Sequence, residues 1–212
     1  MPDNGMTELD LLVGSMFTTL PEEDRDLYEE EREWLADVQE LLREEGVEAD
    51  LLSRPGVEVW EGGIERYRDL FLLRLLAVYL EHNQDIQRLL APEAELDGEP
   101  DPLLVAIWED EKPTRFPHLV KHQAEGGYYL PTDFAEPIWI AVEPDDDDDD
   151  EPLEEAVVSF GSSIGLQREL VELEGMLVAA GVPATSPALR CLAVLREAAD
   201  RSIATDLPII VW

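Results

Sequence analysis

Residues 64–80 read IERYRDLFLLRLLAVYL, and the part from Leu70 to Leu80 is the most apolar run in the chain. Apolar side chains would cover almost every side of a helix formed here, and such a helix is normally buried in the middle of a domain. The run is interrupted by Arg74 and is too short to span a bilayer. It therefore predicts the central helix of a domain rather than a membrane anchor.

The sequence on both sides of this run predicts further helices. Residues 22–45 carry apolar side chains at three- and four-residue spacing, acids in the first turn and a densely acidic outer face, which indicates an amphipathic helix. Near the C-terminus, one helix is expected to start at Ser162 or Ser163. A second is expected to start at Ser186, the N-cap residue, with Pro187 in the first helical position.

Short β-branched or aromatic runs bounded by Pro, Gly and Asp predict strands between residues 103 and 160. The segment from His118 to Tyr129 is expected to form a hairpin, and Pro208 to Trp212 a short terminal strand. The fold class predicted for residues 1–212 is a single α+β domain with a helical N-terminal half, a small mostly antiparallel sheet and two C-terminal helices. The expected strands cover residues 103–108, 127–130, 138–142, 157–160 and 208–212.

Acidic residues dominate the composition. The 212 residues include 50 Asp and Glu against 15 Lys and Arg, which gives a formal net charge of -35, and only Lys112 and Lys121 are lysines. Residues 143–155 hold ten of the acids, including six consecutive aspartates, and predict an acidic disordered loop inside the domain. The other residues still carry 40 acids against 15 bases, so the acidity is distributed along the chain.

This charge predicts the kind of partner. An acidic surface repels nucleic-acid phosphates and anionic lipids, so we expect no nucleic acid and no membrane among the partners, and instead a basic protein.

No signal peptide is recognised, and the expected location is the cytoplasm. Cys191 is the only cysteine, so no intramolecular disulfide can form, and its apolar context predicts a buried, inert thiol.

Two histidines are candidates for chemistry. His118 and His122 are four residues apart, and with Asp133 they could form a metal site of two histidines and one carboxylate. Residue 119 is Leu119, so the zinc-protease helix motif, which requires Glu at that position, is absent. The alternative is that both histidines make local hydrogen bonds.

Two further motifs contain candidate binding residues. Residues 125–134 read EGGYYLPTDF, where Tyr128 and Tyr129 would point to opposite faces of a strand, one into the core and one toward a binding edge. Residues 160–166 read FGSSIGL, which is neither a phosphate-binding loop nor a dinucleotide fingerprint. Ser163 matches the Gly-x-Ser-x-Gly pattern of serine hydrolases, but no histidine follows residue 122 to complete a triad. N-capping accounts for Ser162 and Ser163.

These two motifs also carry a resemblance. The segment from His118 to Phe134, with its Gly-Tyr-Tyr-x-Pro-x-Asp-Phe element, and the Gly-Ser-Ser-x-Gly-Leu helix start at residues 161–166 resemble elements of a group of bacterial cytosolic proteins. The resemblance covers about the C-terminal half of the chain and implies no particular activity. In its small size and acidity the chain is also similar to immunity proteins of bacterial toxin systems.

Three functional hypotheses follow. The first is an acidic protein-binding module that masks a basic partner, as an immunity protein masks a toxin or a DNA mimic masks a DNA-binding site. The second is a small-ligand or metal-dependent enzyme with a site near His118, His122 and Asp133, although no catalytic signature is recognised and no cofactor is expected. The third is a structural or accessory protein of a high-salt cytoplasm. The candidate binding residues are His118, His122, Tyr128, Tyr129, Asp133, Ser162 and Ser163.

Overall fold

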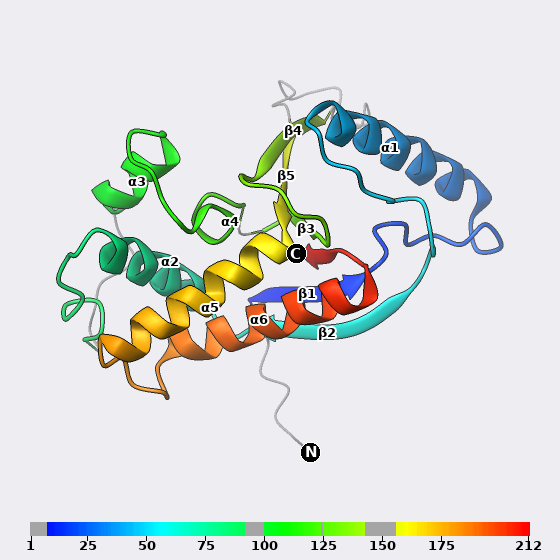
Figure 1. The fold of residues 1–212 in the computed structure, drawn as a ribbon. Coiled ribbons are helices and arrows are strands. Elements are labelled where there is room, and N and C mark those ends of the chain that lie inside the picture. The colour runs from blue at the N-terminus through cyan, green and yellow to red at the C-terminus, as the bar shows by residue number, and fades with distance from the viewer. Residues whose placement is uncertain (1–7, 92–99, 124, 143–155) are drawn as a thin grey trace, which may run out of the picture.

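The computed structural model describes residues 8–91, 100–123, 125–142 and 156–212. Within them, six helices and a six-stranded mixed sheet form a single α+β domain, as predicted (Figure 1). The predicted loop at residues 143–155 lies outside the described residues. The helices are α1 (Arg25–Glu44), α2 (Tyr67–Glu81), α3 (Pro102–Trp108), α4 (Pro117–Val120), α5 (Ser163–Ala179) and α6 (Pro187–Thr205).

The sheet is mostly antiparallel and joins both ends of the chain. Its strand order is β2-β1-β6-β3-β5-β4, and only β3 and β5 run parallel. The C-terminal strand β6 lies between β1 and β3, so it connects the N-terminal hairpin-like pair to the rest of the sheet. The strands are β1 (Leu9–Gly14), β2 (Glu58–Ile64), β3 (Tyr128–Leu130), β4 (Ile138–Val142), β5 (Ala156–Ser162) and β6 (Ile209–Val211).

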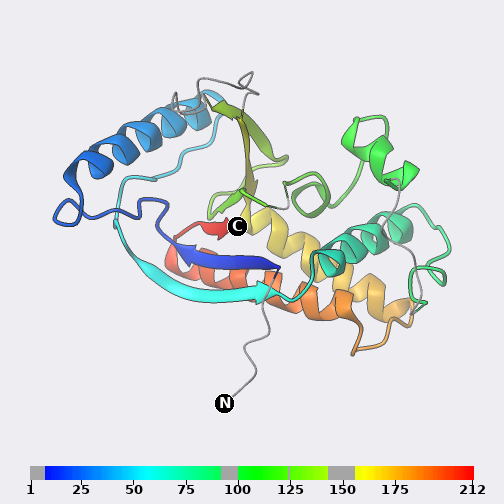
Figure 2. The same ribbon diagram turned by 180° about the vertical axis from the view of Figure 1, so that it is seen from behind.

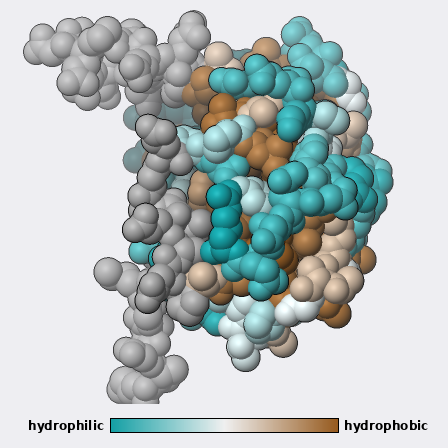
Figure 3. Space-filling view, turned by 90° about the vertical axis from the view of Figure 1, so that its left-hand side faces the viewer, coloured by the Kyte–Doolittle hydropathy of each residue, from teal (hydrophilic) through white to brown (hydrophobic). Residues whose placement is uncertain are grey.

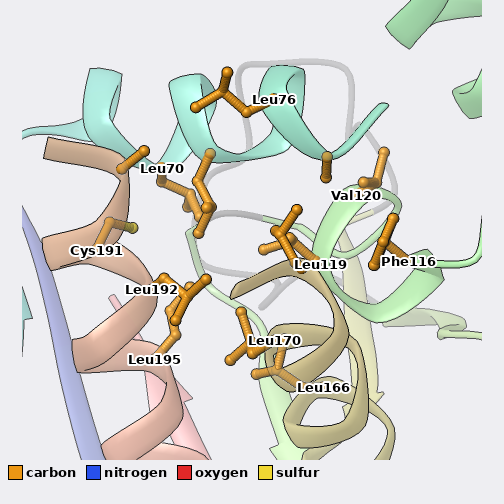
Figure 4. Close-up of a cluster of buried hydrophobic side chains, with 14 of the residues drawn as sticks. Leu70, Leu76, Phe116, Leu119, Val120, Leu166, Leu170, Cys191, Leu192 and Leu195 are labelled. Carbon is orange, nitrogen blue, oxygen red and sulfur yellow. The ribbon is translucent and has the colours of Figure 1, made fainter. Parts of the chain in front are cut away.

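The main core lies on one face of this sheet. The predicted central helix is α2, whose residues 72–79 are all buried, and it packs with α5 and α6. Figure 4 shows side chains from these helices and from α4 pointing into one common cluster, with Leu170 and Leu192 near its middle. Cys191 belongs to this cluster and is 3% exposed, which confirms the prediction of a buried thiol.

A second hydrophobic cluster joins α1 to the opposite face of the sheet. Because side chains alternate along a strand, Tyr129 of β3 faces the main core while Leu130 faces the second cluster. Leu35, Val38 and Leu42 of α1 belong to this second cluster. In both Figures 1 and 2, α1 lies at one corner of the molecule, away from α2 and α3.

Two predictions of local structure are wrong. Residues 103–108 form helix α3 and not a strand, because Asp101 caps the helix by accepting the Leu103 N–H at 3.0 Å and Pro102 occupies the first turn. His118 lies in the short helix α4 and not in a hairpin, since β3 pairs with β5 and β6. Strands β1 and β2 also lie outside residues 103–160, in the otherwise helical N-terminal half.

Candidate functional site

Helix α1 presents a straight row of carboxylates to solvent. Six exposed acidic residues follow one another at alternating intervals of four and three, which places them on one face of a helix. At a rise of about 1.5 Å per residue, the row is about 27 Å long with one carboxylate about every 5.4 Å. We call this row the acidic stripe; it consists of Asp26, Glu30, Glu33, Asp37, Glu40 and Glu44.

The opposite face of α1 is fixed to the domain. Leu35 and Leu42 are 0% exposed and Val38 is 2% exposed, and all three pack in the second hydrophobic cluster. The helix begins at the N-cap residue Asp24, whose side chain accepts the N–H groups of Asp26 and Leu27. The buried face therefore determines that the acidic stripe points away from the molecule.

Two polar side chains of α1 fasten the segments beside it. Glu31 accepts the backbone N–H groups of Thr18 at 2.9 Å and Thr19 at 2.8 Å, and also the Thr18 hydroxyl. Burial raises the pKa of the Glu31 carboxyl, but these donors outweigh burial and hold the pKa below its usual value. Gln39 accepts the N–H of Leu51 at 3.1 Å. These contacts stabilise the position of α1.

Few basic residues neutralise this surface. Residues 22–50 contain fourteen acids and three arginines, namely Arg25, Arg32 and Arg43. Among the described residues, Glu40 is the only member of the acidic stripe in an ion pair, with Arg43. The Arg25–Glu29 pair is on the solvent side, where such pairs add about 0–1 kcal/mol. The stripe is therefore a region of concentrated, solvated negative charge.

The histidines and serines of the sequence motifs form a buried cluster instead. His118 is 1% exposed; its Nδ1 accepts the Ser162 N–H at 3.1 Å, and its Nε2 lies 2.9 Å from the Phe134 carbonyl oxygen. Nε2 therefore carries the proton of a neutral ring and donates it to that carbonyl. Burial lowers the pKa of His118.

His122 is held just as tightly. Its Nδ1 lies 2.6 Å from the Gln123 carbonyl oxygen and its Nε2 lies 3.0 Å from that of Tyr128. The ring stacks on Tyr129 with the two centroids 3.9 Å apart. Burial lowers the pKa of His122 to about 3 although both carbonyls favour the charged form, so the ring is neutral near pH 7 and donates its single N–H to one of the two carbonyl oxygens.

The serines have structural contacts. Ser162 is the N-cap of α5, where its hydroxyl accepts the Gly165 N–H at 2.9 Å, as predicted. Ser163 is not a cap, contrary to the prediction, because it is the first residue of α5. Its hydroxyl lies 2.7 Å from the Ser202 hydroxyl and 3.2 Å from the Tyr129 carbonyl oxygen, and the residue is 0% exposed. Neither histidine is within hydrogen-bond distance of it, so Ser163 is not arranged as a nucleophile.

The tyrosines and Asp133 lie in different environments. Tyr129 is buried and donates its hydroxyl to the His118 carbonyl oxygen at 3.0 Å, whereas Tyr128 is half-buried and stacks on Phe160. Asp133 is exposed and pairs with Arg168 at 2.5 Å. His122 lines one cavity and His118 another.

The two histidines are not arranged to bind a metal ion, because every ring nitrogen of His118 and His122 faces a backbone group. Over the ranges that the structure describes, no group of three or more His, Cys, Asp or Glu side chains could hold a metal ion. The role of the seven candidate residues in binding a partner stays a prediction. The acidic stripe, by contrast, was foreseen as the acidic outer face of the helix at residues 22–45.

The fold and its surface define a class of protein: an α+β domain that displays concentrated carboxylates on a firmly anchored helix. Within the described ranges, no helix is both long enough and apolar enough to cross a membrane. The chain belongs to a family described as "Putative DNA-mimic protein", whose family model matches residues 7–211. No curated protein and no solved structure was found to match it.

Proposed function

We propose that this protein binds the DNA-binding surface of a basic partner and that the acidic stripe occupies the place of DNA phosphates. The observation that carries the proposal is the regular row of carboxylates on one face of a fixed helix, with a spacing of the same order as that of DNA charges. One strand of duplex DNA carries one negative charge per about 3.4 Å of helix axis. The stripe repeats a carboxylate about every 5.4 Å, and Glu45, which forms no ion pair among the described residues, adds charge at its C-terminal end.

Several other features support this role. The family description names DNA mimicry, and its match covers almost the whole chain. Carboxylates fixed on a helix lose less conformational freedom on binding than carboxylates on a flexible tail. The net charge of -35 would also speed the encounter with a basic protein and repel competing anions.

The first experiment compares two variants that each lose four charges. One neutralises the stripe with Glu30→Gln, Glu33→Gln, Asp37→Asn and Glu44→Gln; it spares Glu40, which is paired, and Asp26, which favours the start of the helix. The control neutralises four exposed acids on other elements that form no ion pair among the described residues: Glu58→Gln, Glu61→Gln, Glu109→Gln and Glu111→Gln.

Each protein is immobilised and used to capture partners from host lysate at low and at high salt, and bound proteins are identified by mass spectrometry. We expect wild type and the control to retain the same DNA-binding protein at low salt and to release it at high salt. The stripe variant should retain far less of it. Equal losses in both four-charge variants would mean that only net charge matters, which contradicts the proposal.

A further inference from the structure

A cavity on another part of the molecule has the features of a small-molecule site. Its volume is about 500 Å³, within the range typical of ligand pockets. Tyr67, Phe71 and Arg74 line it from one face of α2, because they are spaced by four and three residues. On the side of the molecule where α2 and α3 lie, Figure 3 shows apolar residues reaching the surface among hydrophilic ones.

Aromatic side chains form the walls of this cavity. Trp108 at the end of α3 is 41% exposed, Trp139 on β4 is 51% exposed, and Tyr67 is 42% exposed. The Trp108 ring is held in place because its Nε1–H donates to the Val120 carbonyl oxygen at 2.9 Å. Partly exposed, fixed aromatic rings are suited to contact a planar apolar ligand.

Arg74 supplies a positive charge that lacks a counter-ion. Its side chain is 6% exposed, and its Nε and Nη2 donate to the carbonyl oxygens of Leu119 and His122, each at 2.8 Å. Within the described residues it forms no ion pair with a carboxylate, and the two hydrogen bonds to carbonyl oxygens leave its charge without a counter-ion. A buried charge is costly unless it is paired, so this guanidinium favours an anion in the cavity.

The other polar groups of the cavity define the ligand further. Lys121 pairs with Asp110 at 2.6 Å and with Glu136 at 3.2 Å, so its charge is already balanced. Gln123 Oε1 is buried and, among the described residues, accepts no hydrogen bond. A ligand that offers an N–H or O–H donor would satisfy this oxygen once the Gln123 side chain rotates it toward the cavity.

We propose that the cavity binds a small aromatic carboxylate that also carries a hydrogen-bond donor. The carboxylate pairs with Arg74, the ring lies against Trp108 and Trp139, and the donor reaches Gln123. Asp110 also lines the cavity, but Lys121 pairs with it at 2.6 Å. Repulsion from more distant, solvated acids is screened beyond about 8 Å at physiological salt. The acidic stripe does not line this cavity, so this proposal and the proposed function can fail separately.

The test uses three related compounds and isothermal titration calorimetry on the full chain. Anthranilate has the ring, the carboxylate and an amino donor; anthranilamide lacks the charge; benzoate lacks the donor. We expect anthranilate to bind at least about tenfold more tightly than anthranilamide, the factor expected for one charge-assisted hydrogen bond. Benzoate should bind more weakly than anthranilate. Equal binding of acid and amide, or no saturable binding in the millimolar range, would overturn the proposal.

Two matched variants locate the site. Trp139→Ala should weaken anthranilate binding, whereas Trp212→Ala should not, since Trp212 is also 51% exposed but does not line the cavity. Arg74→Met should remove the preference for acid over amide, with circular dichroism as the check on folding. If that variant does not fold, the ligand series and the tryptophan pair still decide. An unchanged affinity in Trp139→Ala would place the binding elsewhere and contradict the inference.

Discussion

At the residue scale, glycines make space for the buried histidine rings. A Cβ atom on Gly165 would lie 2.3 Å from His118 Cδ2, and one on Gly127 would lie 2.5 Å from His122 Cε1. A Cβ on Gly161 would lie 2.5 Å from the Tyr129 ring. The glycines of the two sequence motifs thus allow close packing between α4, α5, β3 and β5.

Gly165 and Gly175 provide a matched pair in the same helix. Gly165→Ala should destabilise the protein by about 1–3 kcal/mol, because the new methyl group would overlap His118. A Cβ on Gly175 would meet no atom within 4 Å, so Gly175→Ala should stabilise by about 0.5–1 kcal/mol through helix propensity. Urea unfolding measures both values; similar effects in the two variants would contradict the packing argument.

The buried Glu169 carboxyl gives a prediction about pH. Its oxygens accept the N–H groups of His118 at 3.0 Å and Leu119 at 2.8 Å, and burial raises its pKa from 4.5 to about 8 despite these donors. The folded protein therefore keeps a proton that the unfolded chain releases. The stability contributed by Glu169 is complete below about pH 4.5 and declines as pH rises toward 8.

Glu169→Gln tests this directly. The variant should be less stable than wild type at acidic pH, since its amide nitrogen cannot accept a backbone N–H. The difference in unfolding free energy by which wild type exceeds the variant should then shrink between pH 4.5 and about 8, because Gln does not titrate. Urea unfolding of both proteins across this interval gives the difference. A constant or growing advantage would show that the carboxyl is ionised in the folded protein.

At the element scale, helices with strong local signals were predictable. The starts of α5 and α6 follow from the side chains of Ser162 and Ser186, which cap the helices through residues nearby in sequence. The acidic outer face of α1 follows from periodicity alone. Helix α3 was missed because β-branched residues such as Val105 and Ile107 favour a strand, while its cap and its contacts with α2 favour a helix.

The candidate site was harder to predict because most of its contacts join residues that are distant in the chain. Sequence shows that His118 and His122 are four residues apart, but not that Gly161 and Gly165, more than thirty residues later, would pack against their rings. The cavity around Arg74 likewise joins α2, α3 and β4, which are distant in the chain. Only the acidic stripe lies within one element, and only that surface could be derived from sequence.

Asp101 shows how a cap can also join elements. Besides capping α3, it accepts the Tyr79 hydroxyl of α2 at 2.7 Å. Asp24→Ala should lower the free energy of unfolding by about 1 kcal/mol, because Asp24 only caps α1. Asp101→Ala should lower it by more. The loss of unfolding free energy in Asp101→Ala should be greater by about 1–3 kcal/mol, because the largely buried Tyr79 hydroxyl also loses its acceptor. Equal losses in chemical unfolding would show that the contact between α2 and α3 contributes nothing.

At the scale of the whole molecule, a charge of -35 destabilises the folded state by self-repulsion. Added salt screens this repulsion, so the melting temperature should rise between low and physiological ionic strength. The same salt should weaken capture of a basic partner. These opposite trends can be measured by scanning calorimetry and by salt-graded capture; a melting temperature that falls with salt would show that attractive ion pairs dominate.

The most direct test of DNA mimicry is competition for the captured partner. Labelled duplex DNA is bound to that partner, and wild type, the stripe variant or the four-charge control is titrated in while fluorescence anisotropy is recorded. If the stripe mimics DNA, wild type and the control should displace the DNA at equal concentrations, and the stripe variant should require at least about tenfold more. A partner that binds this protein and DNA at the same time would contradict the account.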